Sequence, residues 1–206
     1  MAEGDGADSP PMLSRKQDDA TVPGVGEPAG RDMGGKVSEK FTRDLLDLYL
    51  SDHLTGSTAG TNRLERMAAD YVDTPCFAEL SRLAEEVRAE QTFLQNLIDA
   101  LGIRRRRHRQ AAAWLGERVA RLKTDGRVLK RSPMTLLLET ELMRSAVHGK
   151  IGGWQTLRAN AEELGLDPET FAELITASER QIATLDQIHG YARIRAIRDD
   201  RKTFWS

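Results

Sequence analysis

The sequence predicts an all-α protein, an antiparallel four-helix bundle made of two helical hairpins that a long crossover with a short helix joins. Composition favours helices over sheets, because hydrophobic residues make up 39%, charged residues 30% and aromatic residues only 5% of the chain. Four long segments repeat their apolar residues every three or four positions, which is the period of an amphipathic helix. Ser-Pro and Asp-Pro pairs mark helix starts, and single glycines mark helix ends.

The chain divides into three parts by composition. Residues 1–37 are rich in Gly, Pro, Asp and Ser and have no apolar period, so we expect a disordered tail that contributes nothing to the core. Residues 38–200 carry the helical pattern and should form the bundle, and residues 201–206 are the C-terminal end.

The first hairpin is expected over residues 38–72 and 75–101. Thr74 is the expected N-cap of its second helix, with Pro75 at the first helical position and Gly102 as the stop signal. A joint this short makes the two helices antiparallel neighbours.

The crossover spans residues 103–132 and should contain a short helix. Ser132 and Pro133 then open the third long helix, which we expect to continue to Gly165, and Asp167 and Pro168 open the fourth. A short helix of about 27 Å is long enough to traverse the bundle, so we expect the second hairpin to be inverted relative to the first.

The net charge is −2, which gives no overall attraction to nucleic acid or membrane. Cys76 is the only cysteine, so no internal disulfide can form. We find no signal-peptide pattern and no apolar run of the roughly 20 residues that span a bilayer, and we therefore expect a cytoplasmic protein.

Two phrases of the sequence carry a family resemblance. FAELSRLAEEVRAEQTFLQNLIDALG (residues 77–102) resembles the second helix of the bacterial stress-associated ferritin-like proteins. YLSDHLTGSTAG (residues 49–60) and RSPMTLLLETELMRSAVHGKIGGW (residues 131–154) resemble, more closely, a group of actinobacterial helical-bundle proteins of the ferritin-like kind. The resemblance covers most of residues 41–198. It implies a ferritin-like bundle, and the closer of the two brings no activity with it.

The same resemblance defines where metal ligands would stand. Ferritin-like oxidases carry a carboxylate and a Glu-x-x-His motif in each half. Here the first such place has Glu86 but no histidine after it, and the second reads Asp186 to His189. Iron, manganese or zinc would therefore have to use an incomplete set, and the candidate ligands are Asp52, His53, Glu141, Asp186 and His189. An inverted second hairpin would put His53 and His189 near opposite ends, which argues against one cluster.

The apolar stripe of the first helix is interrupted in its middle by Asp52, His53, Ser57 and Gly60. One interpretation is a ligand or metal pocket between helices. The other is a buried histidine, hydrogen-bonded to a partner such as Asp52, beside closely packed helices. Lys150 and Trp154, with glycines around them, likewise indicate either a cation–π or anion site or a close helix crossing.

The crossover is strongly basic. Residues 104–131 hold eleven Lys or Arg against two acidic residues, a net charge of +9. Such a stripe suits nonspecific binding of nucleic-acid phosphate, of an anionic lipid surface or of an acidic partner, or it offsets the acidic bundle surface. The candidate polyanion-binding residues are Arg104, Arg105, Arg106, Arg107, Arg109 and Arg131.

We found no phosphate-binding loop, nucleophile elbow or zinc-protease motif. The sequence therefore favours a structural or interaction-type helical bundle without an intact catalytic centre and without a cofactor. The alternatives are a degenerate ferritin-like metal protein acting in oxidative stress, and a weak, nonspecific polyanion binder. The expected partners are a second copy of the chain, nucleic acid or an acidic protein.

Overall fold

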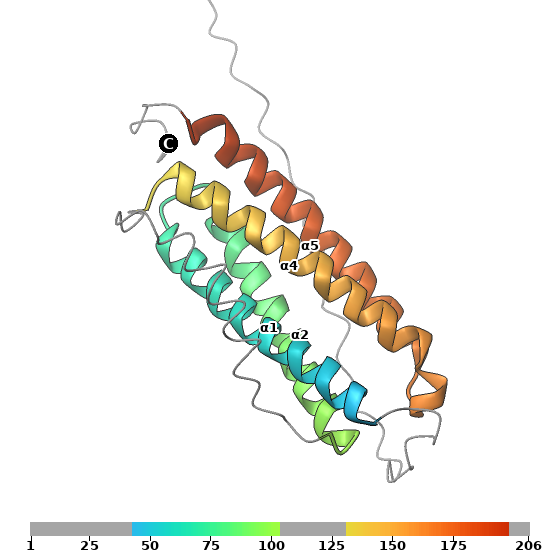
Figure 1. The fold of residues 1–206 in the computed structure, drawn as a ribbon. Helices are drawn as coiled ribbons and strands as arrows, with labels where there is room; N and C mark the ends of the chain where they lie inside the picture. The colour runs from blue at the N-terminus through green and yellow to red at the C-terminus, as the bar shows by residue number, and fades with distance from the viewer. Residues whose placement is uncertain (1–42, 104–130, 198–206) are drawn as a thin grey trace, which may run out of the picture. The chain divides into compact units, whose positions relative to one another are not determined.

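The computed structural model describes residues 43–103 and 131–197, and within them it contains four long helices and no strand (Figure 1). They are α1 (Arg43–Asp70), α2 (Phe77–Ala100), α4 (Pro133–Ala159) and α5 (Pro168–Arg195), with a short 3₁₀ helix, η1 (Glu162–Leu164), before α5. The prediction of an all-α, four-helix protein is confirmed at this level. The predicted tail, the crossover helix and the C-terminal end lie outside the described residues.

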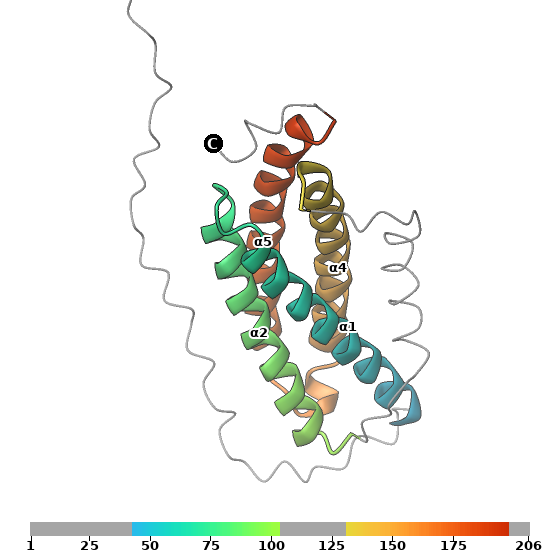
Figure 2. The same ribbon diagram turned by 90° about the vertical axis from the view of Figure 1, so that its left-hand side faces the viewer.

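The two hairpins, α1–α2 and α4–α5, lie side by side (Figures 1 and 2). Helix α1 runs antiparallel to α4, because Tyr49 Oη lies 3.0 Å from Thr156 Oγ1 and Arg63 Nη1 lies 2.7 Å from Glu139 Oε1. Arg131, just before α4, forms an ion pair with Asp73 in the joint between α1 and α2. Helix α4 therefore starts at the end of the bundle opposite to the end of α2, as expected for an inverted second hairpin.

Two of the predicted helix starts are confirmed. The Ser132 hydroxyl accepts a hydrogen bond from the Thr135 backbone N–H at 3.1 Å, and the Asp167 carboxylate accepts one from the Glu169 N–H at 3.0 Å. In both cases the next residue is a proline, whose missing N–H costs nothing in the first helical turn.

Helix α1 ends at Asp70, two residues before the predicted end at residue 72, and the start of α2 and the end of α4 also differ from the prediction. Helix α2 starts at Phe77 rather than Pro75, because the Thr74 hydroxyl donates to the Tyr71 carbonyl at 2.7 Å and closes a turn instead of capping a helix. Helix α4 ends at Ala159, six residues before the expected stop at Gly165. Gly165, with φ of +69°, ends η1 instead, and Gly102, with φ of +62°, follows α2 as predicted.

The apolar core consists of two clusters along the bundle. One surrounds Tyr71, Leu80 and Leu185 at the end where α1 meets α2. The other surrounds Leu50, Trp154 and Phe171 at the end where α4 meets α5. Between these clusters, α2, α4 and α5 contribute buried polar side chains in place of leucines, and the candidate site lies at this level.

Candidate ligand-binding site

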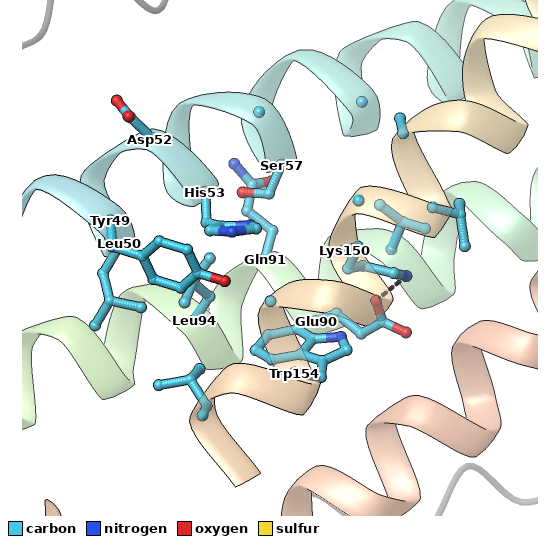
Figure 3. Close-up of a pocket in the computed structure, with 18 of the residues that line it drawn as sticks. Tyr49, Leu50, Asp52, His53, Ser57, Glu90, Gln91, Leu94, Lys150 and Trp154 are labelled. Carbon is cyan, nitrogen blue, oxygen red and sulfur yellow. Dashed lines mark hydrogen bonds and ion pairs between the residues drawn. The ribbon is translucent and has the colours of Figure 1, made fainter. Parts of the chain in front are cut away.

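A pocket of about 330 Å³ opens between α1, α2 and α4 at the junction of the two apolar clusters (Figure 3). Its walls are mostly apolar, and the hydrocarbon surface comes from Leu50, Val87, Leu94, Met143 and Leu157. This volume is at the lower end of the range for small-molecule sites. It has room for about ten water molecules.

Glycines keep this space open. A Cβ atom built on Gly56 of α1 or on Gly149 of α4 would meet no atom within 4 Å, and one on Gly60 would lie 3.7 Å from Met143 Cε. Each glycine inside a helix costs roughly 0.5–1 kcal/mol of stability relative to alanine. At Gly56 and Gly149 no close packing offsets that cost. The close helix packing considered for this region is therefore wrong at these two positions, and the pocket interpretation fits them.

His53 forms part of the pocket wall, packed against α4. A Cβ on Gly153 would lie 2.8 Å from His53 Cε1, so the imidazole occupies the space that any side chain at Gly153 would need. The Tyr49 ring contacts it edge-on, with the two centroids 4.5 Å apart. Burial lowers the pKa of His53, and the charge of Asp52 only partly opposes that shift. The imidazole is therefore neutral at pH 7.

The expected hydrogen bond between His53 and Asp52 is absent. Asp52 is exposed and points away from the pocket (Figure 3), and no described residue hydrogen-bonds the imidazole. The physical reason is helical geometry, because adjacent residues on a helix point in directions about 100° apart. His53 is thus half-buried in the pocket wall without the partner that the sequence suggested.

A buried polar network closes the inner side of the pocket. The Lys150 ammonium donates to Glu90 Oε2 and to Gln181 Oε1, and Gln181 Nε2 donates to Glu90 Oε1 at 2.8 Å and to Glu86 Oε2 at 3.1 Å. The side chains of Lys150 and Glu90 are only 17% and 9% exposed. Burial lowers the pKa of Lys150, while Glu90 favours its charged form. The network joins α2, α4 and α5.

Trp154 borders the pocket one turn after Lys150. Its indole stacks on Phe171, with centroids 6.4 Å apart and planes inclined by 30°, and Phe93 meets it edge-on at 6.1 Å. Trp154 is only 4% exposed, and its Nε1 has no hydrogen-bond acceptor among the described residues. The suggested cation–π contact with Lys150 is not formed, because the ammonium is held by Glu90 and Gln181 instead.

The five candidate metal ligands do not converge. Asp52 and His53 lie at the pocket, His189 Nε2 lies 3.2 Å from Glu141 Oε1, and Asp186 pairs with Arg144 at 2.7 Å. Glu141 and Gly153 are twelve residues apart on α4, so the two histidines are separated by roughly 18 Å along the bundle. Nowhere in residues 43–103 and 131–197 do three His, Cys, Asp or Glu side chains gather as metal ligands would.

Of the candidate polyanion-binding residues, Arg131 alone is described, and the other five fall in the undescribed range 104–130. Arg131 pairs with Asp73, and its guanidinium lies 5.7 Å from the centre of the Tyr71 ring. Its charge is thus partly compensated within the bundle.

Sequence reasoning missed Glu90 and Gln181. Gln91, the residue after Glu90, also lines the pocket, and its Nε2 donates a 2.8 Å hydrogen bond to Thr58 Oγ1. Glu90 has the same three-residue spacing from Val87 as the buried residues around it, and Lys150 the same spacing from Val147. A glutamate on the apolar stripe of α2 and a lysine on that of α4, at the same level along the bundle, are the sequence signal that would have predicted the pair of Glu90 and Lys150.

Comparison with family models, with curated proteins and with solved structures finds no significant match to this chain. None of the described helices is long and apolar enough to cross a membrane.

Proposed function

We propose that this protein is a non-enzymatic, interaction-type helical bundle that binds a small, largely apolar molecule in the pocket between α1, α2 and α4. One observation carries the proposal: Gly56 and Gly149 lower helix stability, lie exposed on the open side of the pocket that they line, and leave space there in which a Cβ atom would meet no neighbour within 4 Å. An alanine at either position would stabilise its helix, so a glycine there is expected where the open volume itself is used.

The chemistry of the pocket supports binding rather than catalysis. Among the titratable side chains that line it, Lys150 and Glu90 pair with each other, Asp52 points away from the pocket (Figure 3), and no described residue hydrogen-bonds the His53 imidazole to orient its proton. A general acid–base catalyst needs such an orienting partner to hold its proton-transfer geometry. An apolar cavity with few polar groups is typical of a ligand site.

We also propose the ferritin-like relationship on two grounds: the quoted phrases of the sequence and the layout of two hairpins with the second inverted. The proposed ligand function does not depend on it. Fold alone does not assign an activity, and the candidate metal ligands are dispersed over three places.

The experiment fills the pocket from one of the glycines. Gly149→Leu places a side chain at the pocket, and Gly152→Leu is the matched control, because Gly152 is on the same helix, has the same open surroundings and does not line the pocket. Ethylbenzene is titrated into the labelled protein and followed by amide chemical shifts in NMR spectra.

We expect ethylbenzene to bind the natural chain and the Gly152→Leu variant alike and to bind Gly149→Leu at least tenfold more weakly. Both variants should be as stable as the natural chain or more so, because leucine is a far better helix former than glycine. The proposal is wrong if ethylbenzene at its solubility limit shifts no pocket resonance, or if both variants bind it equally well.

A further inference from the structure

The His53 imidazole offers the pocket two hydrogen-bonding atoms that no described residue uses. Figure 3 shows the ring directed into the space between α1 and α4, while Asp52 points away from that space. No described residue hydrogen-bonds either ring nitrogen, and both nitrogens are open to water, whereas Trp154 Nε1 is fully covered. A ligand in the pocket can therefore reach the polar atoms of His53.

Two further polar side chains line the pocket near His53. Ser57 follows His53 by one helical turn, so the two side chains share a face of α1. The Ser57 hydroxyl donates its hydrogen to the Leu54 carbonyl at 2.9 Å, which leaves its lone pairs to accept from another group. Gln91 comes from α2, and its Oε1 is open to water and has no donor among the described residues.

The hydrogen-bonding character of these groups decides which ligand group fits. A neutral imidazole has one N–H donor and one acceptor nitrogen, and burial lowers the pKa of His53, so the neutral form is present at pH 7. Ser57 and Gln91 add acceptor oxygens. A ligand group that displaces water from these atoms loses affinity unless it reproduces the hydrogen bonds of water. A hydroxyl group both donates and accepts, as water does, whereas a carbonyl oxygen only accepts.

The charged side chains around the pocket favour an uncharged ligand. Asp52 points away (Figure 3), and the Lys150 ammonium is held by Glu90 and Gln181. A carboxylate or an ammonium group on the ligand would be left without a counter-ion in a mostly apolar pocket. Burying such an uncompensated charge is strongly unfavourable.

We propose that the ligand is an uncharged, mainly apolar molecule with one hydroxyl group, which hydrogen-bonds the His53 imidazole. This inference rests on the proposed function, because it names the class of ligand for the same pocket. The hydrocarbon part of the ligand then lies against Leu50, Leu94 and Leu157, which line the pocket from three helices.

The test compares three molecules with one carbon skeleton: ethylbenzene, 1-phenylethanol, whose hydroxyl donates and accepts, and acetophenone, whose carbonyl only accepts. Each is titrated at pH 7.5 into the full natural chain, into His53→Phe and into Tyr49→Phe. His53→Phe keeps a flat ring in the pocket wall and removes both nitrogens. Tyr49→Phe is the matched control, because it removes from the same wall a hydroxyl that already pairs with Thr156 Oγ1 at 3.0 Å.

Loss of one hydrogen bond should lower the affinity about two- to tenfold. We therefore expect 1-phenylethanol to bind the natural chain about fivefold more tightly than acetophenone does. Its affinity relative to ethylbenzene should fall about fivefold in His53→Phe and stay within about twofold in Tyr49→Phe.

A second measurement uses only the natural chain and does not need a stable variant. The imidazole nitrogen resonances of His53 should shift more on binding 1-phenylethanol than on binding ethylbenzene, because nitrogen shifts respond to hydrogen bonding. If none of the three molecules binds the natural chain, the proposed function fails. If ethylbenzene binds but the imidazole resonances do not distinguish the alcohol from it, or if the relative affinity for the alcohol is unchanged in His53→Phe or falls equally in Tyr49→Phe, the pocket binds apolar molecules and the inference of a hydroxyl at His53 is wrong.

Discussion

Replacing Lys150 with methionine should strongly destabilise the protein, although it puts an apolar residue into a largely apolar place. Methionine matches the length of the aliphatic stem but removes the ammonium that compensates Glu90, whose side chain is only 9% exposed. Removing one partner of a buried ion pair leaves an uncompensated charge and costs about 3–5 kcal/mol. For a domain of this size, about 3 kcal/mol corresponds to a lower thermal midpoint by roughly 6–12 °C.

The double variant Lys150→Met/Glu90→Leu supplies the decisive comparison. With both charges gone, the apolar pair should recover most of the lost stability and reach that of the natural chain within about 1 kcal/mol, because replacing a buried pair by apolar residues is often neutral or stabilising. Equilibrium unfolding in urea at pH 7 measures both variants and Glu90→Leu, which completes the double-mutant cycle. If Lys150→Met costs less than about 1 kcal/mol, or if the two single losses simply add, the pair is not a buried, coupled unit.

Three further predictions concern single groups. Because burial lowers the pKa of His53 from 6.5, the folded state binds its proton less well than the unfolded chain, so this contribution to stability is complete above pH 6.5 and is lost as the pH falls through the lowered value. The thermal midpoint of His53→Leu should accordingly fall less than that of the natural chain between pH 7.5 and pH 5, and identical slopes would contradict the burial argument. Burial raises the pKa of the Cys76 thiol to about 11 from 9.0, so at pH 8 it should react with a disulfide reagent roughly a hundredfold more slowly than a free thiol, and rapid labelling of the folded protein would disprove this. Binding of the chain to nonspecific DNA should weaken by roughly 10³-fold between 50 and 200 mM salt and be mostly lost when residues 104–107 become alanine; no binding at 50 mM salt would rule out the polyanion hypothesis.

The sequence predicted helix starts correctly where residues close in the chain decide the structure. Ser132 with Pro133 and Asp167 with Pro168 start helices as predicted, because a capping side chain next to a proline fits few other conformations. The Thr74-Pro75 pair carries a similar signal but forms a turn, because the Thr74 hydroxyl donates a hydrogen bond to the Tyr71 carbonyl instead of accepting one from a helix N–H. A cap and a turn use the same residue types, so only the neighbouring backbone decides between them.

The sequence predicted one part of the pocket. The interruption of the stripe at His53, Ser57 and Gly60 indicated that α1 lacks leucines there, and all three line the pocket. Sequence spacing could not decide whether the glycines bring two helices close together or hold them around open space. That distinction depends on the separation of α1 and α4, which Tyr49 with Thr156 and Arg63 with Glu139 set from either side.

The polar network and the pocket are best understood together. Glu90, Lys150 and Gln181 come from three helices and meet only if the two hairpins adopt one axial alignment, because a shift by one turn of about 5.4 Å would leave all three buried without partners. The apolar clusters on either side would tolerate such a shift better, since leucine contacts are not directional. The network therefore fixes how α4, with Gly149, is placed along α1, with Gly56, and so the position of the pocket that both glycines line. If this is correct, the apolar double variant at Lys150 and Glu90 should keep its stability while its pocket becomes less well defined, and ethylbenzene should bind it more weakly than the natural chain.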